Sequence, residues 1–252
     1  MSSEIDVKRV KARIRETIWR LLEESNVAEF PRPVYGRIPN FKGADEAARR
    51  LFELKVWSSA QVVKSNPDSP QYYVRLQALR EGKLLVMASP RLRSGFLLID
   101  PRRVPPSKYV YAATIKGAFI YGRRIRLSEI PPVDLVIAGC VAVNEKGARL
   151  GKGGGYSELE YGILREAGLI TDSTPIATTV HDLQLIRDDI PLEIHDLTVD
   201  YIATPSRIVE IKPRGYKPRG IYWELLTPEL RELEVIKELM RFKTRTSSDK
   251  RT

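Results

Sequence analysis

Short apolar runs alternate with amphipathic segments along most of the chain. The run over 133–138 is continuous and rich in β-branched residues, as in a strand that is buried on both faces. The segment over 5–24 instead places Val10, Ile14 and Ile18 on one side, which predicts an amphipathic helix. Such alternation is typical of βαβ units. It therefore predicts a three-layer α/β fold, with helices on both faces of an open, mostly parallel sheet.

The same reasoning predicts the remaining elements. Further helices are expected over 44–54 and 74–80, and further strands over 60–64, 83–88, 95–99, 175–180, 199–203 and 208–211. A basic linker rich in Pro and Gly follows, and 228–240 has one apolar face. We therefore expect an α/β domain over 1–211 and, over 212–252, a linker, an amphipathic C-terminal helix and a disordered tail.

A glycine-rich segment follows the buried strand. Its glycines can place several backbone N–H groups in one concavity (Gly151, Gly153, Gly154 and Gly155). Ser157 and Glu160 then fit a capping box at the start of a helix that ends at Gly168. Arg149 and Lys152 add two cations at the same point. Amide donors, a helix N-terminus and cations together predict an anion site, and phosphate is the anion that suits them best.

The spacing of these glycines fits neither the Walker loop nor the dinucleotide-binding fingerprint. On spacing alone, a plain turn into a helix explains the segment as well as a ligand site does. The neighbouring basic residues favour the ligand site, because a turn does not need them.

The chain is strongly basic. Its 42 Lys and Arg residues outnumber 32 Asp and Glu residues, which gives a formal net charge of +10. This balance favours anionic partners such as a nucleotide, a folate polyglutamate or RNA. A generally basic, charge-rich surface would give the same balance, so charge alone does not decide between them.

A single cysteine, Cys140, excludes an internal disulfide and favours a cytoplasmic location. Nothing at the N-terminus resembles a signal peptide. No apolar run is long enough to span a membrane, so we expect no membrane partner.

Several motifs resemble those of one enzyme family, the 5-formyltetrahydrofolate cyclo-ligases, also called methenyltetrahydrofolate synthetases. Asp134 and the segment Gly-Ala-Arg-Leu-Gly-Lys-Gly-Gly-Gly-Tyr over 147–156 resemble the family signature. The segment over 184–204 resembles its C-terminal half, and Gly-Lys-Leu-Leu-Val over 82–86 its central strand. The resemblance spans residues 8–211. It is closer still to the branch of methenyltetrahydrofolate synthetase domain-containing proteins, whose motifs recur over 30–34, 37–43, 90–93 and 180–182.

This resemblance implies an open cyclo-ligase-like sheet of the CoA-transferase type and an ATP-dependent activity. In that reaction 5-formyltetrahydrofolate is cyclised to 5,10-methenyltetrahydrofolate, with release of ADP and phosphate. The implied cofactors are ATP and Mg²⁺, and the implied substrate is a reduced folate.

The resemblance also implies a set of nucleotide-binding residues (Lys11, Arg15, Arg149, Gly151, Lys152, Gly153, Gly154, Gly155 and Tyr156). Of these, Arg149 and Lys152 are the candidate catalytic residues. Glu158 stands where the family has its metal-linked Asp and is the candidate Mg²⁺ ligand. Asp68 is the candidate for the acidic folate contact.

Tyr156, Arg91, Arg93 and His181 are further candidates for substrate contacts. Arg91 and Arg93 directly follow a predicted parallel strand, where open α/β sheets bind ligands, and their guanidinium groups suit carboxylate or phosphate. Two surface arginines in a turn would give the same pattern. His181 follows another strand and precedes Asp182, which suits an acid–base group or equally a helix-capping histidine. We expect a structural role for His195.

The sequence departs from the family at one point. The family usually continues its Gly-Tyr with Tyr-Asp-Arg or a close variant, whereas this chain has Ser-Glu-Leu over 157–159. A non-catalytic or altered-substrate member of the family, which binds nucleotide or RNA, therefore stays open as the alternative.

Overall fold

The chain folds around an eight-stranded sheet in the order β13-β12-β10-β7-β3-β4-β5-β6, in a computed structural model that describes residues 2–248. The strands are β3 (Val62–Ser65), β4 (Leu84–Ala88), β5 (Phe96–Ile99), β6 (Arg123–Ile125), β7 (Leu135–Ile137), β10 (Ile176–Thr179), β12 (Tyr201–Ala203) and β13 (Ile208–Glu210). The central strands from β12 to β4 are parallel. The outer strands β13, β5 and β6 join by antiparallel pairing. The predicted open, mostly parallel sheet is thus confirmed.

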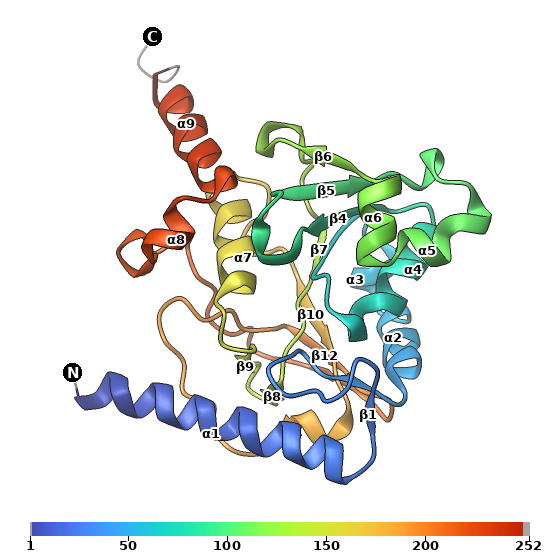
Figure 1. Cartoon of the computed structure of the whole chain (residues 1–252), viewed down its shortest axis with the longest axis vertical. Helices are drawn as coiled ribbons and strands as arrows, with labels where there is room; N and C mark the ends of the chain where they lie inside the picture. Colours follow the sequence, from blue (N-terminus) through green and yellow to red (C-terminus); the bar gives the residue numbers. More distant parts are fainter. Residues whose placement is uncertain (1, 249–252) are drawn as a thin grey trace.

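Helices cover both faces of this sheet (Figure 1). They are α1 (Ser2–Glu24), α2 (Ala44–Phe52), α3 (Lys55–Ser58), α4 (Tyr72–Arg80), α5 (Tyr109–Ala112), α6 (Ile115–Tyr121), α7 (Tyr156–Glu166), α8 (Pro228–Arg231) and α9 (Glu234–Ser248). Leu135 and Ile137 of β7 pack with α2, α3 and α4, whereas Val136 between them packs with α7 and α9. Successive side chains of a strand point to opposite faces, so the apolar run over 133–138 fills both layers of the core.

Two small sheets lie outside the main one, and the sequence analysis did not foresee them. β1 (Ala28–Glu29) pairs with β2 (Asn40–Phe41), and β8 (Ala142–Asn144) lies between β9 (Arg149–Leu150) and β11 (Leu185–Ile186). The apolar face of α1 packs on the β8–β9 hairpin through Ile18 and Leu22. This hairpin leads the chain directly into the glycine-rich segment.

The capping box predicted at the start of α7 is wrong. Gly155 is the N-cap, with a left-handed φ of 68°, so α7 begins two residues earlier than predicted and Ser157 lies within its first turn. Glu160 is buried and accepts hydrogen bonds from Lys64 and Asn66 instead of capping the helix. Burying the Lys64 ammonium without a paired carboxylate would cost free energy, so Glu160 pairs with Lys64 and does not cap the helix.

The C-terminal segment also differs from the prediction. The helix expected over 228–240 is divided into α8 and α9, and α9 continues to Ser248 through part of the tail expected to be disordered. Residues 249–252 lie outside the described residues. Val235, Ile236 and Leu239 of α9 are buried in the same cluster as α7. The C-terminal segment therefore shares the apolar core of the main body. The division of the chain into two parts at residue 212 stays a prediction.

Within residues 2–248, no helix combines the length and the apolar character that crossing a lipid bilayer requires.

Candidate active site

The order of the parallel strands reverses between β3 and β7, and open α/β sheets bind ligands at the carboxyl ends of such strands. Asn66 follows β3 and Gly139 follows β7, and the Gly139 N–H donates to Asn66 Oδ1 at 3.0 Å. A pocket of about 500 Å³ lies beside this junction. Its walls come from α1, the residue Asp68 beyond β3, the glycine loop (residues 151–155), the first turn of α7 and the loop over 193–196. Residues between 220 and 230 in the C-terminal segment also line the pocket.

A buried polar group fixes α7 at this edge of the sheet. Lys64 Nζ lies 2.5 Å from Glu160 Oε2, and Asn66 Nδ2 donates to the same oxygen at 2.7 Å. Burial raises the pKa of the Glu160 carboxyl, while the Lys64 ammonium opposes that shift. These contacts hold the N-terminus of α7 over the ends of β3 and β7.

The glycine loop presents backbone donors to the pocket. Gly153 has a φ of 99° and Gly155 a φ of 68°, conformations that residues with a Cβ rarely adopt. In the described part of the chain, the N–H groups of residues 152–155 have no hydrogen-bond partner. The first N–H groups of α7 also lack intrahelical acceptors. The loop and the helix end together can therefore bind an anion.

Two predicted cations flank these amides. Arg15 lines the pocket, and its Nε donates to the Gly151 carbonyl at 2.7 Å. Burial lowers the pKa of the Arg15 guanidinium, while the nearby Asp196 and Glu193 carboxylates oppose the shift. Lys152 Nζ lies 3.1 Å from Asp68 Oδ1, and the Lys152 side chain is 43% exposed. Lys152 can therefore turn towards a bound anion at little cost, because exposed ion pairs contribute little stability.

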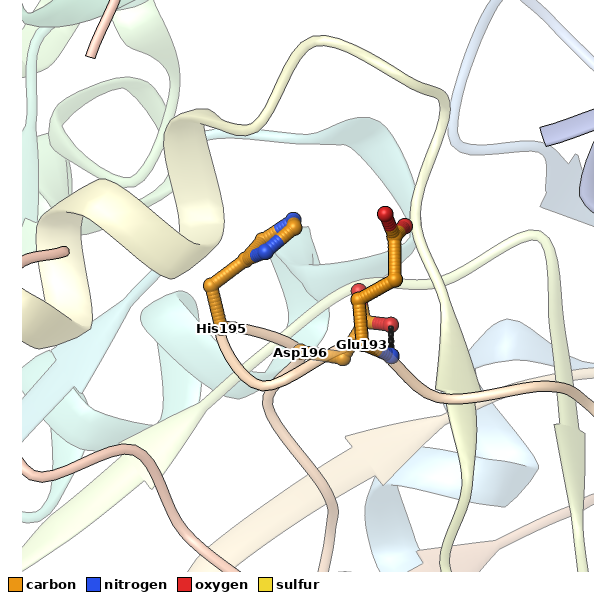
Figure 2. A group of neighbouring side chains, drawn as sticks. All are labelled: Glu193, His195 and Asp196. Atoms are coloured by element: carbon orange, nitrogen blue, oxygen red, sulfur yellow. Dashed lines mark hydrogen bonds between the residues drawn. The ribbon is translucent and has the colours of Figure 1, made fainter. Parts of the chain in front are cut away.

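Lys11 lies in the pocket but is occupied by carboxylates. Its ammonium is buried, lies 2.7 Å from Glu193 Oε2 and pairs with Asp196. Figure 2 shows Glu193, His195 and Asp196 on one loop, where the Glu193 N–H donates to Asp196 Oδ2 at 2.6 Å. Their ligand atoms lie within 4.8 Å of one another, so these residues could hold a metal ion. His195, which we expected to be structural, thus belongs to the pocket wall.

Arg149 does not line the pocket. Its side chain is fully buried, and its guanidinium donates to the carbonyls of Gly139 at 2.7 Å and Leu197 at 3.3 Å. It also pairs with Glu158. The side chain thus holds the strand before the glycine loop against its neighbours, and the catalytic, nucleotide-contacting role of Arg149 stays a prediction.

Glu158, the predicted metal ligand, lines the pocket but has Arg149 as its partner. It is not part of the group of carboxylates that could hold a metal ion in residues 2–248. Its carboxylate instead neutralises the buried guanidinium. Tyr156, at the start of α7, lines the pocket as predicted, with its ring against Gly154.

Arg91, Arg93 and His181 do not reach the pocket. The chain turns back after β4 to form the antiparallel β5, so Arg91 and Arg93 lie exposed in that turn, the first with a φ of 54°. His181 Nδ1 accepts a hydrogen bond from the Leu183 N–H at 3.1 Å and caps a short 3-10 helix. Burial lowers the pKa of this imidazole. The capping alternative for His181 is the one that the geometry bears out.

Sequence reasoning missed one wall of the pocket altogether. Apolar side chains from the C-terminal strap (residues 217–230) line it (Ile221, Tyr222, Leu225, Leu226 and Leu230). Nothing in the apolar pattern of these residues indicates which part of the molecule they meet, so no sequence signal could have placed them.

Comparisons with known proteins place the chain in a family. Residues 7–205 match the model of the 5-formyltetrahydrofolate cyclo-ligase family. The chain is 43% identical over 225 residues to a methenyltetrahydrofolate synthase domain-containing protein of Bos taurus, covering 87% of this chain and 59% of that protein. It is 38% identical over 242 residues to a protein of the same name from Danio rerio, covering 94% of this chain and 63% of that protein. The chain therefore spans less than two thirds of the length of these relatives.

The solved structure of Aquifex aeolicus 5,10-methenyltetrahydrofolate synthetase has the same fold, with a TM-score of 0.52 at 16% identity. The superposition covers 85% of this chain and 98% of that one. With most of the residues of this chain matching the family model, the chain belongs to the 5-formyltetrahydrofolate cyclo-ligase family.

Proposed function

We propose that this protein is an ATP-dependent 5-formyltetrahydrofolate cyclo-ligase that produces 5,10-methenyltetrahydrofolate, ADP and phosphate. The observation that supports this proposal most directly is the loop of unpartnered amides over 152–155, which lies beside the cations Arg15 and Lys152 in one pocket. Such a site suits a triphosphate.

The proposed chemistry begins with transfer of the γ-phosphoryl group of ATP to the formyl oxygen of the folate. The phosphorylated oxygen is a good leaving group, so N10 of the folate attacks the carbon, the ring closes and phosphate leaves. Phosphoryl transfer depends mostly on positioning and on neutralising charge. The glycine-loop amides would hold the triphosphate, and Lys152 and Arg15 would stabilise the charge that spreads over the transferred group.

The reaction also needs Mg²⁺, which prefers oxygen ligands. Glu193 and Asp196 fit this ion, because their carboxylates lie together beside the glycine loop in the same pocket. We propose them as the ligands, with the ion taking the place of the Lys11 ammonium that pairs with both carboxylates. The Glu158 carboxylate pairs with the buried Arg149 guanidinium. The bound ion would supply positive charge to the triphosphate.

The decisive experiment mixes the purified protein with 5-formyltetrahydrofolate, ATP and Mg²⁺ and follows the near-ultraviolet absorbance of methenyltetrahydrofolate. We expect an ATP-dependent rise. Lys152→Met should lower kcat on the order of a hundredfold, as loss of one charge-stabilising donor does. Arg93→Met removes an exposed arginine outside the pocket and should change nothing.

A flat trace from folded protein that still binds ATP would refute the proposal and indicate a changed substrate or lost catalysis. RNA would then be the next ligand to test, because the net charge of +10 favours polyanions. RNA affinity should in that case fall steeply with salt.

A further inference from the structure

The C-terminal strap gives the pocket a second chemical character. The glycine loop, Arg15 and Lys152 make one part of the wall polar and cationic, whereas the strap contributes mainly apolar side chains. These residues follow position 205, where the match to the family model ends. The strap therefore lies outside the part of the chain that matches the family model.

Buried polar contacts hold the start of the strap on the main body. Lys217 Nζ lies 2.8 Å from Asp200 Oδ2, and the two side chains are only 4% and 1% exposed. The same ammonium donates to the Thr174 carbonyl at 2.8 Å. Breaking such a buried pair is strongly destabilising, because it leaves an uncompensated charge in the interior. The strap is thus anchored at this end.

A second anchor holds the strap against α7. Glu166 Oε1 accepts hydrogen bonds from the Ile221 N–H at 2.9 Å and from Trp223 Nε1 at 3.1 Å. Gly162 lets the two backbones approach, since a Cβ added there would lie 3.0 Å from the Gly220 carbonyl oxygen. The apolar side chains that follow are therefore held in position along the pocket.

These side chains keep apolar surface accessible within the pocket. Leu225 is 52% exposed, and Tyr222, Leu226 and Leu230 are partly buried. Ligand pockets commonly combine such an apolar lining with a few polar groups that fix orientation. A molecule with an anionic end and a flat, weakly polar ring system would satisfy both parts of this wall.

We propose that the strap is the ring-binding wall of the pocket, with Leu225, Leu226 and Leu230 packing against the planar heteroaromatic ring of a bound substrate. This inference rests on the proposed function, in which two substrates carry such a ring: the adenine of ATP and the pterin ring of the reduced folate. Covering these leucines with a ring removes apolar surface from water and so increases affinity.

The test uses the full chain with Leu225→Asn and Leu230→Asn combined. Val110→Asn on α5 is the matched control, because Val110 is 55% exposed and does not line the pocket. Calorimetry measures the binding of ATP, of inorganic triphosphate and of 5-formyltetrahydrofolate. The cyclisation assay gives kcat and both KM values.

We expect the double variant to lose affinity for one ring-bearing ligand on the order of tenfold, with kcat little changed. Weaker ATP binding with unchanged triphosphate binding would assign the wall to adenine. Weaker folate binding alone would assign it to the pterin ring. Either result supports the proposal, even if the wild type shows no turnover.

If the wild type is active and the double variant binds both ligands with unchanged affinity, the ring-binding role of the strap is refuted and the proposed function still stands. A wild type that binds neither ligand would overturn both. A loss that Val110→Asn shares would also contradict the proposal, because that residue lies far from the pocket wall.

Discussion

At the scale of single residues, two cations that are neighbours in the sequence differ in burial and in their partners. Arg149 and Lys152 are three positions apart and both cationic, but the first is fully buried and the second is 43% exposed. The buried Arg149 side chain has three protein partners, namely the Gly139 and Leu197 carbonyls and Glu158. Exposure leaves Lys152 able to exchange Asp68 for a phosphate.

Arg149→Met should therefore lower the free energy of unfolding by about 3–5 kcal/mol, because it leaves Glu158 and two carbonyls without their donor. Turnover should fall as well, since the strand before the glycine loop loses its fastening. Denaturant unfolding and the cyclisation assay measure the two effects. Lys152→Met is the matched comparison and should change stability by less than about 1 kcal/mol. Wild-type stability of Arg149→Met would contradict the positioning role.

For His181 we predict an effect on the pH dependence of stability and no effect on turnover. Burial lowers the pKa of its imidazole in the folded state, so the unfolded chain binds the proton more readily. Its contribution to stability is fully present above the unfolded pKa of about 6.5 and is lost as the pH falls through the lower folded pKa. His181→Asn should keep turnover, because the asparagine still accepts a capping hydrogen bond.

The variant should also show a shallower loss of stability than the wild type as the pH falls below about 6.5. Thermal unfolding at several pH values tests this. A loss of turnover in folded His181→Asn protein would instead restore the acid–base role.

At the scale of elements, α7 joins the parts of the pocket. Its N-terminus closes the glycine loop, Glu160 reaches the end of β3 through Lys64, and Glu166 holds the strap. A change on the face of α7 that meets the strap should thus alter substrate binding without touching the glycine loop.

Gly162→Ala is such a change. The new Cβ would lie 3.0 Å from both the Gly220 carbonyl oxygen and Ile221 Cγ1, so the strap must shift. We expect the KM of one substrate to rise severalfold with little change in kcat. Gly168→Ala is the control: its φ of 73° strains an alanine by about 1–2 kcal/mol, but nothing lies within 4 Å of the added Cβ. Equal KM values in both variants would show that the strap does not depend on this contact.

Local patterns predicted the elements well because their causes are local. The apolar run over 133–138 and the glycine loop keep their predicted roles in the fold, since strand burial and backbone freedom follow from the residues themselves. The capping box failed because Lys64 lies 96 positions from Glu160 and claims its carboxylate. The burial of Arg149 likewise could not be predicted, because it depends on β9 meeting the chain around Gly139 and Leu197. A single sequence does not indicate which distant segments are in contact.

At the scale of the whole molecule, the pocket is assembled from segments that span nearly the whole chain, from Lys8 to Leu230. Unfolding of the main body therefore destroys the pocket, and a ligand that binds only the folded state must stabilise the entire fold. At a concentration a hundredfold above its Kd, such a ligand adds about 2.7 kcal/mol. For a chain of this size we expect ATP with Mg²⁺ to raise Tm by roughly 5–10 °C.

Removing Mg²⁺ separates the metal's contribution to this rise in Tm from the contribution of the glycine loop. A chelator should reduce the ATP-dependent rise in Tm, because the triphosphate then meets Glu193 and Asp196 without the intervening ion. Asp196→Asn should remove the dependence on Mg²⁺ and keep the part due to the glycine loop, whereas Glu158→Gln should keep the dependence on Mg²⁺, since its carboxylate serves Arg149. Calorimetric unfolding with ATP alone, Mg²⁺ alone and both together measures these shifts. If Glu158→Gln abolished the effect of Mg²⁺ and Asp196→Asn did not, the metal would belong to the first turn of α7 and not to the loop over 193–196.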